Sequence, residues 1–409
     1  MDFIILAAGK GERLWPLTES TPKCMVRVLG RPLLEWTVEA IEPYAEKIVI
    51  VVGHKKELLV EHFKAKSYSQ KMRFAVQEKQ EGTGHALLQA EKSVKGDFVA
   101  INGDNFFSPE ALVHVCREAN ASKSAVVFAK KMDDCRNFGV FREKGGKIAG
   151  FEEKPKGKKP GLINLNLFKA PKKFFSYLHK LKRSPRGEYE LPDALLAYAL
   201  ENECCLRELD GQWSDVGFFW NYIDANAYAA ENLTDRKVEG IVEEGVVVRG
   251  KMHLGKGSVI KAPSRIEGPV WIGENATVGP HAFLRAGSVI ENDCHVGSSE
   301  VKNSVLLAGA NAPHFSYVGD SVLCEEVNLG AGTKIANLRF DNASVQVRFP
   351  TTKKEYDSAR RKLGACIGRG TKVGINACIN CGILVGENCK VFPGAKVASG
   401  LKSGTVAKE

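Results

Sequence analysis

The chain has 409 residues, a hydrophobic content of 44% and a formal net charge of +10. This length suggests two domains or three, and the composition is that of a globular protein with sizeable cores. No apolar run approaches the roughly 20 residues that span a bilayer, and Phe3 to Ala8 is too short for a signal peptide, so we expect a cytoplasmic protein without membrane contact.

The eleven cysteines are scattered and odd in number, so they predict no disulfide framework. Cys378 and Cys381 form a C-x-x-C pair with Cys366 and Cys389 nearby, but zinc would need further ligands at one point. Buried free cysteine commonly acts as a small hydrophobe, which is the interpretation we favour.

The positive charges are dispersed along the chain. No basic stripe interleaved with aromatic residues appears, so we expect no nucleic-acid partner. Most of these charges are expected on a solvated surface, and a few are expected to face the phosphates of anionic small substrates.

In the N-terminal half, short β-branched runs alternate with amphipathic segments. The runs predict strands at Phe3–Leu6, Ile48–Val52, Arg73–Val76, Phe98–Ile101 and Ala125–Phe128. Helices are expected at Leu33–Ile41 and Thr83–Ala90. This alternation predicts an α/β, Rossmann-like layer fold with a mostly parallel sheet, in which ligands bind beyond the carboxyl ends of the strands.

The first expected strand runs directly into a glycine-containing string. Leu6-Ala7-Ala8-Gly9-Lys10-Gly11-Glu12-Arg13 is followed by Thr21-Pro22-Lys23. Glycines after a strand let backbone amides approach a phosphate, and Arg13 and Lys23 add cationic donors. The spacing differs from that of a P-loop and from G-x-G-x-x-G. The whole string closely resembles the signature of sugar-1-phosphate nucleotidylyltransferases.

Further segments follow in the order typical of that family, and the resemblance implies their roles. The implied nucleotide-binding residues are Leu6, Ala8, Gly9, Gly11, Gln77, Gly82 and Thr83. The implied sugar-phosphate-binding residues are Gly139, Glu153, Lys154 and Asn164. The family often has Asn-x-Gly at the last position, whereas Leu165 and Asn166 follow here. A side chain at 166 would either crowd the sugar or add a hydrogen bond, so the sugar stays open.

Two acidic positions complete this set. Asp104 follows the strand Phe98–Ile101, and Asp215 lies in a segment that resembles the family's second acidic segment. Taken singly, an aspartate after a strand is usually a cap or turn residue. The resemblance implies that both hold Mg²⁺, a hard cation that prefers oxygen and shared phosphate ligands. The implied catalysts are Arg13 and Lys23, which neutralise charge as a sugar phosphate attacks the α-phosphorus of a nucleoside triphosphate.

A connecting helix is expected over 218–233. Tyr222, Ala225, Ala229 and Leu233 would form its apolar stripe. We place the domain boundary at residue 235, which gives a nucleotidylyltransferase domain over 1–235 and a second domain over 236–409.

In the second domain, aliphatic residues recur at a spacing of six. The first series is Leu254, Ile260, Ile266, Ile272, Val278, Leu284, Ile290 and Val296, and the second is Ile367, Val373, Ile379, Val385, Val391 and Val397. This period fits neither a helix nor an alternating strand, but it fits a stacked solenoid with one short strand and one turn per hexad. The pattern resembles the hexapeptide-repeat acyltransferases, which implies a left-handed parallel β-helix, a homotrimer or a multiple of trimers, and acyl-coenzyme A bound between neighbouring helices.

The interruptions of this repeat carry a second resemblance. Residues 311–320 and 327–338 resemble the acetyltransferase half of bifunctional glucosamine-1-phosphate acetyltransferase/N-acetylglucosamine-1-phosphate uridylyltransferases, particularly their archaeal relatives. A lone loop histidine is mostly a surface residue, but the resemblance implies that His314 is the general base that deprotonates the sugar amine. The implied sugar-phosphate-binding residues are Arg285, Lys302, Tyr317, Asn328 and Lys362, and the implied acetyl-CoA-binding residues are Asn337 and Ala365.

The leading hypothesis is a bifunctional enzyme. It would acetylate a hexosamine 1-phosphate, with glucosamine favoured, and transfer a nucleotidyl group from an NTP, with UTP favoured, to give UDP-N-acetylglucosamine and pyrophosphate. One alternative is a single-function thymidylyl- or guanylyltransferase whose β-helix only oligomerises, against which His314 and Lys302 argue. Another is a non-catalytic scaffold or regulatory subunit, against which Arg13, Lys23 and Asp104 argue.

Overall fold

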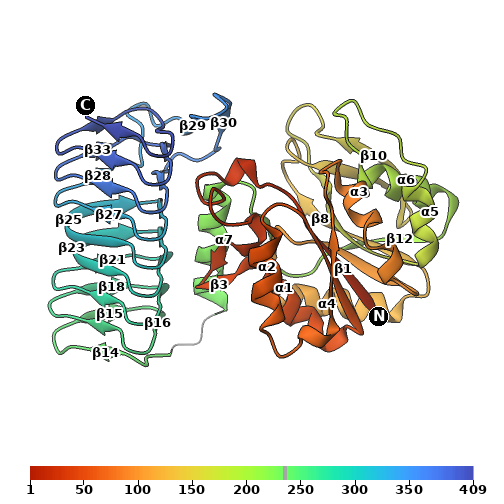
Figure 1. Ribbon diagram of the computed structural model, residues 1–409, viewed down its shortest axis with the longest axis horizontal. Helices are drawn as coiled ribbons and strands as arrows, with labels where there is room; N and C mark the ends of the chain where they lie inside the picture. Colours follow the sequence, from red (N-terminus) through yellow and green to blue (C-terminus); the bar gives the residue numbers. More distant parts are fainter. Residues whose placement is uncertain (234–236, 409) are drawn as a thin grey trace. The chain divides into compact units, whose positions relative to one another are not determined.

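The computed structural model describes residues 1–233 and 237–408 and divides them into two compact units (Figure 1). The first unit comprises Met1–Lys10, Thr21–Met25 and Pro32–Asp215. The second comprises Gly11–Ser20, Val26–Arg31 and the remaining described residues. The predicted boundary at residue 235 lies outside the described residues, and the helix before it is grouped with the second unit.

The first unit is built on a nine-stranded sheet of order β5-β4-β1-β6-β11-β8-β12-β10-β9. Its strands are β1 (Asp2–Ala7), β4 (Lys47–Val52), β5 (Met72–Val76), β6 (Phe98–Asn102), β8 (Ala125–Met132), β9 (Gly139–Lys144), β10 (Lys147–Glu153), β11 (Gly161–Ala170) and β12 (Cys204–Glu208). Strands β10 and β11 run against the others of this sheet. Each strand predicted from the sequence lies within one of these strands.

Helices cover both faces of this sheet (Figure 1). They are α1 (Leu33–Ile41), α2 (Lys56–Lys64), α3 (Thr83–Leu88), α4 (Pro109–Ala121), α5 (Phe175–Leu178) and α6 (Leu191–Glu201). Phe3 and Ile5 of β1 enter the core under α1, α2 and α4, whereas Ile4 and Leu6 enter the core under α3, α5 and α6. Burial on both faces explains why the central strands are continuously apolar.

A small antiparallel pair extends this arrangement beyond β6. Strand β7 (Asn105–Phe107) pairs with β13 (Trp213–Asp215), and Asp215 lies opposite Asn105. This pairing brings a carboxylate from a distant part of the chain next to the turn that follows β6.

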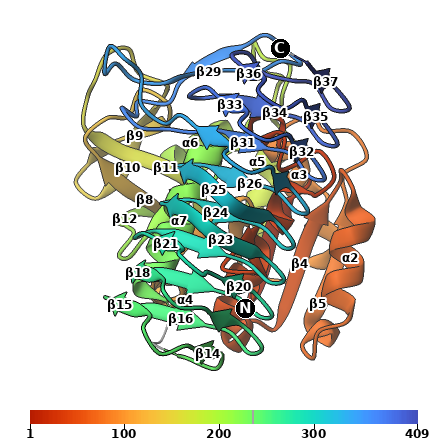
Figure 2. The same ribbon diagram turned by 90° about the vertical axis from the view of Figure 1, so that its left-hand side faces the viewer.

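The second unit is a stack of short parallel strands in three columns (Figure 2). One column is β14-β17-β20-β23-β25-β27-β32-β35-β37, the second is β15-β18-β21-β23-β25-β28-β33-β36 and the third is β16-β19-β22-β24-β26-β31-β34. The strands before the insertion are β14 (Ile241–Val242), β15 (Val247–Arg249), β16 (Met252–Leu254), β17 (Val259–Ile260), β18 (Arg265–Glu267), β19 (Val270–Ile272), β20 (Thr277–Val278), β21 (Phe283–Leu284), β22 (Ser288–Ile290), β23 (His295–Lys302), β24 (Val305–Leu306), β25 (Asn311–Gly319), β26 (Val322–Leu323), β27 (Asn328–Leu329) and β28 (Lys334–Ile335). After it come β31 (Cys366–Ile367), β32 (Lys372–Val373), β33 (Cys378–Ile379), β34 (Leu384–Val385), β35 (Lys390–Val391), β36 (Lys396–Val397) and β37 (Val406–Ala407). The unit is therefore a parallel β-helix.

The hexad residues fill the interior of this β-helix, as predicted. Every member of the two series is at most 4% exposed. Leu254 pairs with Ile272, and Ile272 pairs with Ile290, so that one coil contains three hexads. The stretch between β28 and β31 is an insertion that carries the antiparallel hairpin of β29 (Gln346–Arg348) and β30 (Glu355–Asp357).

The connecting helix α7 (Phe219–Asn232) packs on this β-helix, against β19 and β22. It also holds the short strand β2 (Arg27–Val28), which pairs with β3 (Arg31–Pro32). The fully buried Asn226 accepts a hydrogen bond from the backbone N–H of Leu29 at 3.0 Å, and the hydroxyl of Tyr222 donates to the carbonyl of Arg27. The predicted helix is confirmed, and its apolar side is covered within the second unit.

A buried acid lies beside this contact. Glu291 is 1% exposed, and its Oε2 atom lies 3.9 Å from Nη1 of Arg27. Burial, opposed by the charge of Arg27 and reinforced by that of Glu325, raises the pKa of Glu291 to about 7. In the folded protein Glu291 therefore keeps its proton up to about pH 7, well above the range of an ordinary glutamate.

Glu291→Gln should stabilise the second unit at alkaline pH. Between the ordinary pKa of 4.5 and the folded value of about 7, the folded protein holds a proton that the unfolded chain has lost, so wild-type stability falls as pH rises through this window. We expect the variant to gain about 3 kcal/mol at pH ~8 and almost nothing at pH ~4. Urea unfolding at both pH values measures this, with the exposed Glu274→Gln as control. An equal gain at both pH values would mean that the charge is not the cause.

Candidate functional site

Three of the predicted residues meet in the first unit. The Nζ atom of Lys23 lies 2.7 Å from Oδ2 of Asp104 and 3.7 Å from Oδ1 of Asp215. Asp104 sits in the turn after β6, Asp215 comes from β13, and Lys23 begins a short 3₁₀ turn. Lys23 is buried while both carboxylates are partly exposed, so the pair of acids is open to a ligand.

The donor set of this acidic pair fits a hard divalent cation. Mg²⁺ is usually bound through one or two carboxylates together with substrate phosphates. Among residues 1–233 and 237–408, no group of three or more His, Cys, Asp or Glu side chains that could hold a metal occurs. Asp104 and Asp215 could therefore hold Mg²⁺ only with oxygen ligands from substrate or water, and the C-x-x-C pair belongs to no such group.

The other predicted nucleotide-binding residues of this unit lie at the carboxyl ends of β1 and β5. Leu6 belongs to β1, and Ala8 and Gly9 follow it directly. A Cβ atom on Gly9 would meet no other atom within 4 Å, so the backbone there is open to a close-lying anion.

The segment after β5 is held rigidly. The buried side chain of Gln77 donates a hydrogen bond to the carbonyl of Gly82 at 3.1 Å. Gly82 has a φ of 103°, and a Cβ atom there would lie 2.6 Å from the carbonyl oxygen of Tyr189, so this position requires glycine. Thr83 begins α3, and its hydroxyl accepts a hydrogen bond from the N–H of Leu191 at 3.2 Å.

Two residues of the signature string are grouped with the second unit. The guanidinium of Arg13 lies 5.1 Å from the ring centre of Phe218, at the start of α7. Gly11 has a φ of 69°, and its carbonyl accepts a hydrogen bond from the hydroxyl of Thr18 at 2.9 Å. These contacts fix the conformation of the string between β1 and Lys23.

The predicted sugar-binding residues of the first unit lie on β9, β10 and β11. Gly139 pairs with Glu153, and a Cβ atom on Gly139 would lie 2.2 Å from the ring of Phe151. Lys154 follows with a φ of 50°, and its N–H donates to the carbonyl of Phe138 at 3.0 Å. Glycine at 139 is thus required for the hairpin to close on Phe151.

Asn164 makes a reciprocal contact with Asn166. Its Nδ2 donates to Oδ1 of Asn166 at 2.8 Å, and the N–H of Asn166 donates to Oδ1 of Asn164 at 2.8 Å. Asn166 has a φ of 48°, a conformation that asparagine tolerates better than most residues. This explains how asparagine replaces the glycine of the family pattern: its side chain turns to Asn164.

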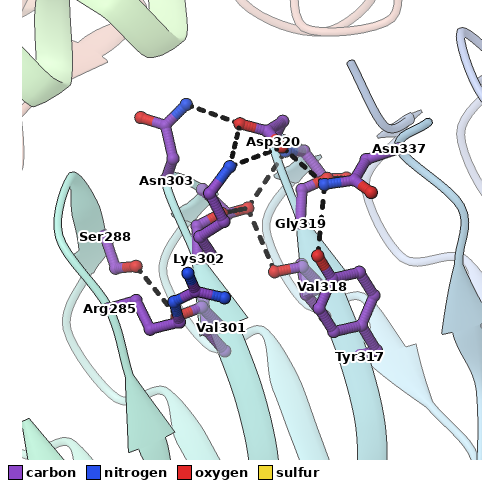
Figure 3. Close-up of polar contacts among 12 residues, drawn as sticks. Arg285, Ser288, Val301, Lys302, Asn303, Tyr317, Val318, Gly319, Asp320 and Asn337 are labelled. Atoms are coloured by element: carbon purple, nitrogen blue, oxygen red, sulfur yellow. Dashed lines mark hydrogen bonds and ion pairs between the residues drawn. The ribbon is translucent and has the colours of Figure 1, made fainter. Parts of the chain in front are cut away.

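The second unit carries a polar cluster on β23 and β25 and in the segments that follow β23, β25 and β28 (Figure 3). We call it the Asp320 cluster, and it consists of Lys302, Asn303, Tyr317, Asp320 and Asn337. Lys302 Nζ lies 3.0 Å from both carboxylate oxygens of Asp320, and Asn337 Nδ2 lies 2.6 Å from Oδ2 of Asp320. Asn337 Nδ2 also donates to the hydroxyl of Tyr317 at 3.1 Å. Burial raises the pKa of Tyr317, so its hydroxyl keeps its proton.

Arg285 lies on the coil next to Lys302. Its Nη1 donates to Oε1 of Glu300 at 2.8 Å, and this bond raises the pKa of Arg285. The register Leu284–Val301 places Arg285 and Lys302 on adjacent coils. Two cationic side chains are therefore stacked on one face of the β-helix, as a site for a phosphate would require.

The remaining predicted residues lie on β25, on β27 and in the segment between β30 and β31. The exposed His314 lies on β25 opposite Ser298. Burial and the neighbouring His314 both lower the pKa of His295. Asn328 begins β27 opposite Asn311. Lys362 is exposed at the end of the insertion, and Ala365 is fully buried at the start of the next coil.

Sequence reasoning missed two residues that shape these sites. Asp320 lies within the segment 311–320, but nothing in its sequence context indicates that its carboxylate is buried. His295 was missed for the same reason, because its neighbours are set by the stacking of coils. For these residues of the β-helix, the one indication in the sequence was a polar side chain between two aliphatic hexad positions. At Asn166 the sequence left open whether the side chain crowds the sugar or forms a hydrogen bond, and the structure shows a hydrogen bond with Asn164.

Comparison with known proteins gives a matching family for each of these two regions. The family described as "Nucleotidyl transferase" matches residues 3–232, and the family described as "GlmU-like, C-terminal hexapeptide" matches residues 281–350. A solved structure from Bacillus anthracis, named as a candidate glucose-1-phosphate thymidylyltransferase, is 32% identical with a TM-score of 0.52, over 58% of this chain and 98% of that one. It therefore matches only part of the chain.

Two relatives match almost the whole length. "Bifunctional protein GlmU" of Methanococcus vannielii is 40% identical over 95% of this chain and 92% of its own. "Bifunctional sugar-1-phosphate nucleotidylyltransferase/acetyltransferase" of Sulfurisphaera tokodaii is 37% identical over 97% of both chains. No helix among the described residues is long and apolar enough to cross a membrane. The chain therefore belongs to the GlmU family, bifunctional enzymes that combine a sugar-1-phosphate nucleotidylyltransferase with an acetyltransferase.

Proposed function

We propose that the second unit acetylates glucosamine 1-phosphate with acetyl-CoA and that the first unit transfers a uridylyl group from UTP to the product. The products would be UDP-N-acetylglucosamine, pyrophosphate and free CoA. The observation that carries this proposal is the Asp320 cluster beside Arg285, because a β-helix that only oligomerised would need no polar cluster across its stacked coils.

In the first unit, the protein would position the sugar phosphate and UTP and neutralise the charge of the triphosphate. The sugar phosphate oxygen attacks the α-phosphorus of UTP and pyrophosphate leaves, and no general base is needed because the phosphate is already ionised. Lys23 and Arg13 would neutralise charge on the triphosphate. Bound Mg²⁺, held by Asp104 and Asp215, would supply further neutralisation. Gln77 and Gly82 would read the base, while Glu153, Lys154 and Asn164 would orient the sugar.

In the second unit, the reaction is amide formation. The sugar nitrogen attacks the acetyl carbonyl, the new C–N bond forms, the C–S bond breaks, and His314 takes the amine proton and passes it to the leaving thiolate. Arg285 and Lys302 would hold the sugar phosphate together with Tyr317, Asn328 and Lys362. The acyl donor would lie against Asn337 and Ala365.

A panel assay tests this proposal. Each NTP is supplied with glucose, glucosamine and N-acetylglucosamine 1-phosphates, with and without acetyl-CoA, and pyrophosphate and free thiol are measured. We expect UTP with N-acetylglucosamine 1-phosphate to give the fastest pyrophosphate release and glucosamine 1-phosphate to give thiol release. Nucleotidyl transfer without any acetyl transfer would favour the alternative of a single-function thymidylyl- or guanylyltransferase. The comparison among the three sugar phosphates is the most informative part of this assay, because the Asn164–Asn166 pair stands where the family often has glycine.

We further propose a left-handed β-helix that assembles as a trimer or a multiple of trimers. The insertion between β28 and β31, with Phe340 fully exposed, is the segment that would reach a neighbouring subunit. Sedimentation at micromolar concentration should give a trimer or one of its multiples. A monomer would contradict an acyl-donor site shared between subunits.

A further inference from the structure

The carboxylate of Asp320 has an unusually complete set of donors for a side chain with no assigned role (Figure 3). Lys302 Nζ lies 3.0 Å from each oxygen, Asn303 Nδ2 donates to Oδ1 at 2.8 Å and Asn337 Nδ2 donates to Oδ2 at 2.6 Å. Asp320 is only 5% exposed. A buried carboxylate persists only when it is paired and hydrogen-bonded, and these three side chains meet that condition.

The backbone at Asp320 is held as firmly as its side chain. Its φ is 50°, its N–H donates to the carbonyl of Lys302 at 2.9 Å, and its carbonyl accepts from the N–H of Gly364 at 2.9 Å. A Cβ atom on the preceding Gly319 would lie 2.6 Å from the hydroxyl of Tyr317 and 2.7 Å from Nδ2 of Asn337. The carboxylate is therefore a fixed point around which the other side chains are arranged.

Two of the donors to Asp320, Lys302 and Asn337, are residues assigned to different substrates of acetyl transfer. A lysine side chain is flexible, and the ion pair restricts Lys302, which is partly exposed, to one position beside Arg285. An ionised carboxylate only accepts hydrogen bonds, so it fixes which end of the Asn337 amide faces it. The carbonyl end of that amide is thereby turned away from Asp320.

We propose that Asp320 is a positioning residue that sets the sugar-phosphate contact of Lys302 and the acyl-donor contact of Asn337 at the same time. The proposal rests on the proposed function of the second unit. It implies that loss of one carboxylate weakens the binding of both substrates of acetyl transfer, although Asp320 touches neither.

The test uses variants of the full chain in which a charged side chain is replaced by an uncharged one. Asp320→Asn keeps the volume but removes the charge and turns one acceptor into a donor. We expect the KM values for glucosamine 1-phosphate and for acetyl-CoA each to rise about 10-fold, the worth of one hydrogen bond to a charged group. Asp293→Asn is the matched control, because Asp293 is an exposed aspartate of the same β-helix with a φ of 60°. Circular dichroism and urea unfolding report whether the second unit of each variant is folded.

A double variant separates positioning from a general loss of structure. In a Lys302→Met background, Asp320→Asn should leave the KM for the sugar phosphate nearly unchanged and should still raise the KM for acetyl-CoA through Asn337. This double variant buries no unpaired charge. Its KM for acetyl-CoA is compared with that of the wild type, so it reports the Asn337 contact even if either single variant does not fold. For the single variant Asp320→Asn, a change in kcat with both KM values unchanged, or a rise in only one KM value, would overturn the proposal. Wild-type protein without acetyl transfer would instead overturn the proposed function, and the inference with it.

Discussion

Asp104→Ala should lower pyrophosphate release on the order of 10²–10³-fold or more while acetyl transfer survives. The variant removes the carboxylate that lies 2.7 Å from Nζ of Lys23, so the Lys23 ammonium loses its nearest anionic partner. The proposed Mg²⁺ site then keeps only the carboxylate of Asp215. Asp215→Ala should act in the same direction, because its carboxylate lies 3.7 Å from the same ammonium. Pyrophosphate release and thiol release, measured on the same preparation, give the two activities.

Two features of this experiment identify the cause of the loss. Activity of the variants should depend on higher Mg²⁺ concentrations than that of the wild type, because one of two protein ligands is missing. Asp210→Ala is the control, since Asp210 is an exposed aspartate shortly before β13. Equal loss of both activities would point to misfolding, and full pyrophosphate release in either variant would remove that carboxylate from the mechanism.

The second large effect is expected at His314. His314→Ala should lose about 10²–10⁴-fold in acetyl transfer, the usual contribution of a general base. Nucleotidyl transfer should be nearly unchanged, because that chemistry is assigned to the first unit. In the wild type, acetyl transfer should fall as pH is lowered, because a protonated imidazole cannot accept the proton of the amine.

A second histidine of the same unit provides the comparison. His281 is exposed and has a φ of 60°, so His281→Asn is a mild change at a position that asparagine tolerates. It should retain full acetyl transfer. Retention of acetyl transfer in His314→Ala would mean that another group accepts the proton, and the nearby His295 would be the first to examine.

The fold was predictable where the local sequence pattern has one structural solution. The aliphatic series from Leu254 to Val296 repeats every six residues, which only a stacked coil accommodates, and each member is buried. The run from Phe3 to Leu6 is apolar on both sides, as a strand buried on two faces must be. Helix α7 was predicted from its stripe, but its packing on β19 and β22 depends on contacts between residues far apart in the chain.

The candidate sites were predictable where a motif places the residues, and less so where packing does. Resemblance pointed to Lys23, Asp104 and Asp215, and the β7–β13 pairing that joins them is not visible in any local pattern. The buried state of Asp320 follows from the stacking of three successive coils and from its left-handed backbone. Solvent exposure of a polar residue in a solenoid depends on which coils cover it, and a hexad pattern does not report this.

The grouping of α7 and of residues 11–20 with the β-helix has a consequence for how this protein can be divided. A fragment that ends at residue 233 would keep α7 but lose the coils that cover Tyr222 and Asn226, both fully buried in the intact chain. Its apolar stripe would then be open to solvent, and the fragment would tend to self-associate. The loop that carries Arg13 would lose part of its support as well. The two activities can thus be assigned to different regions of the sequence without being separable by a single cut.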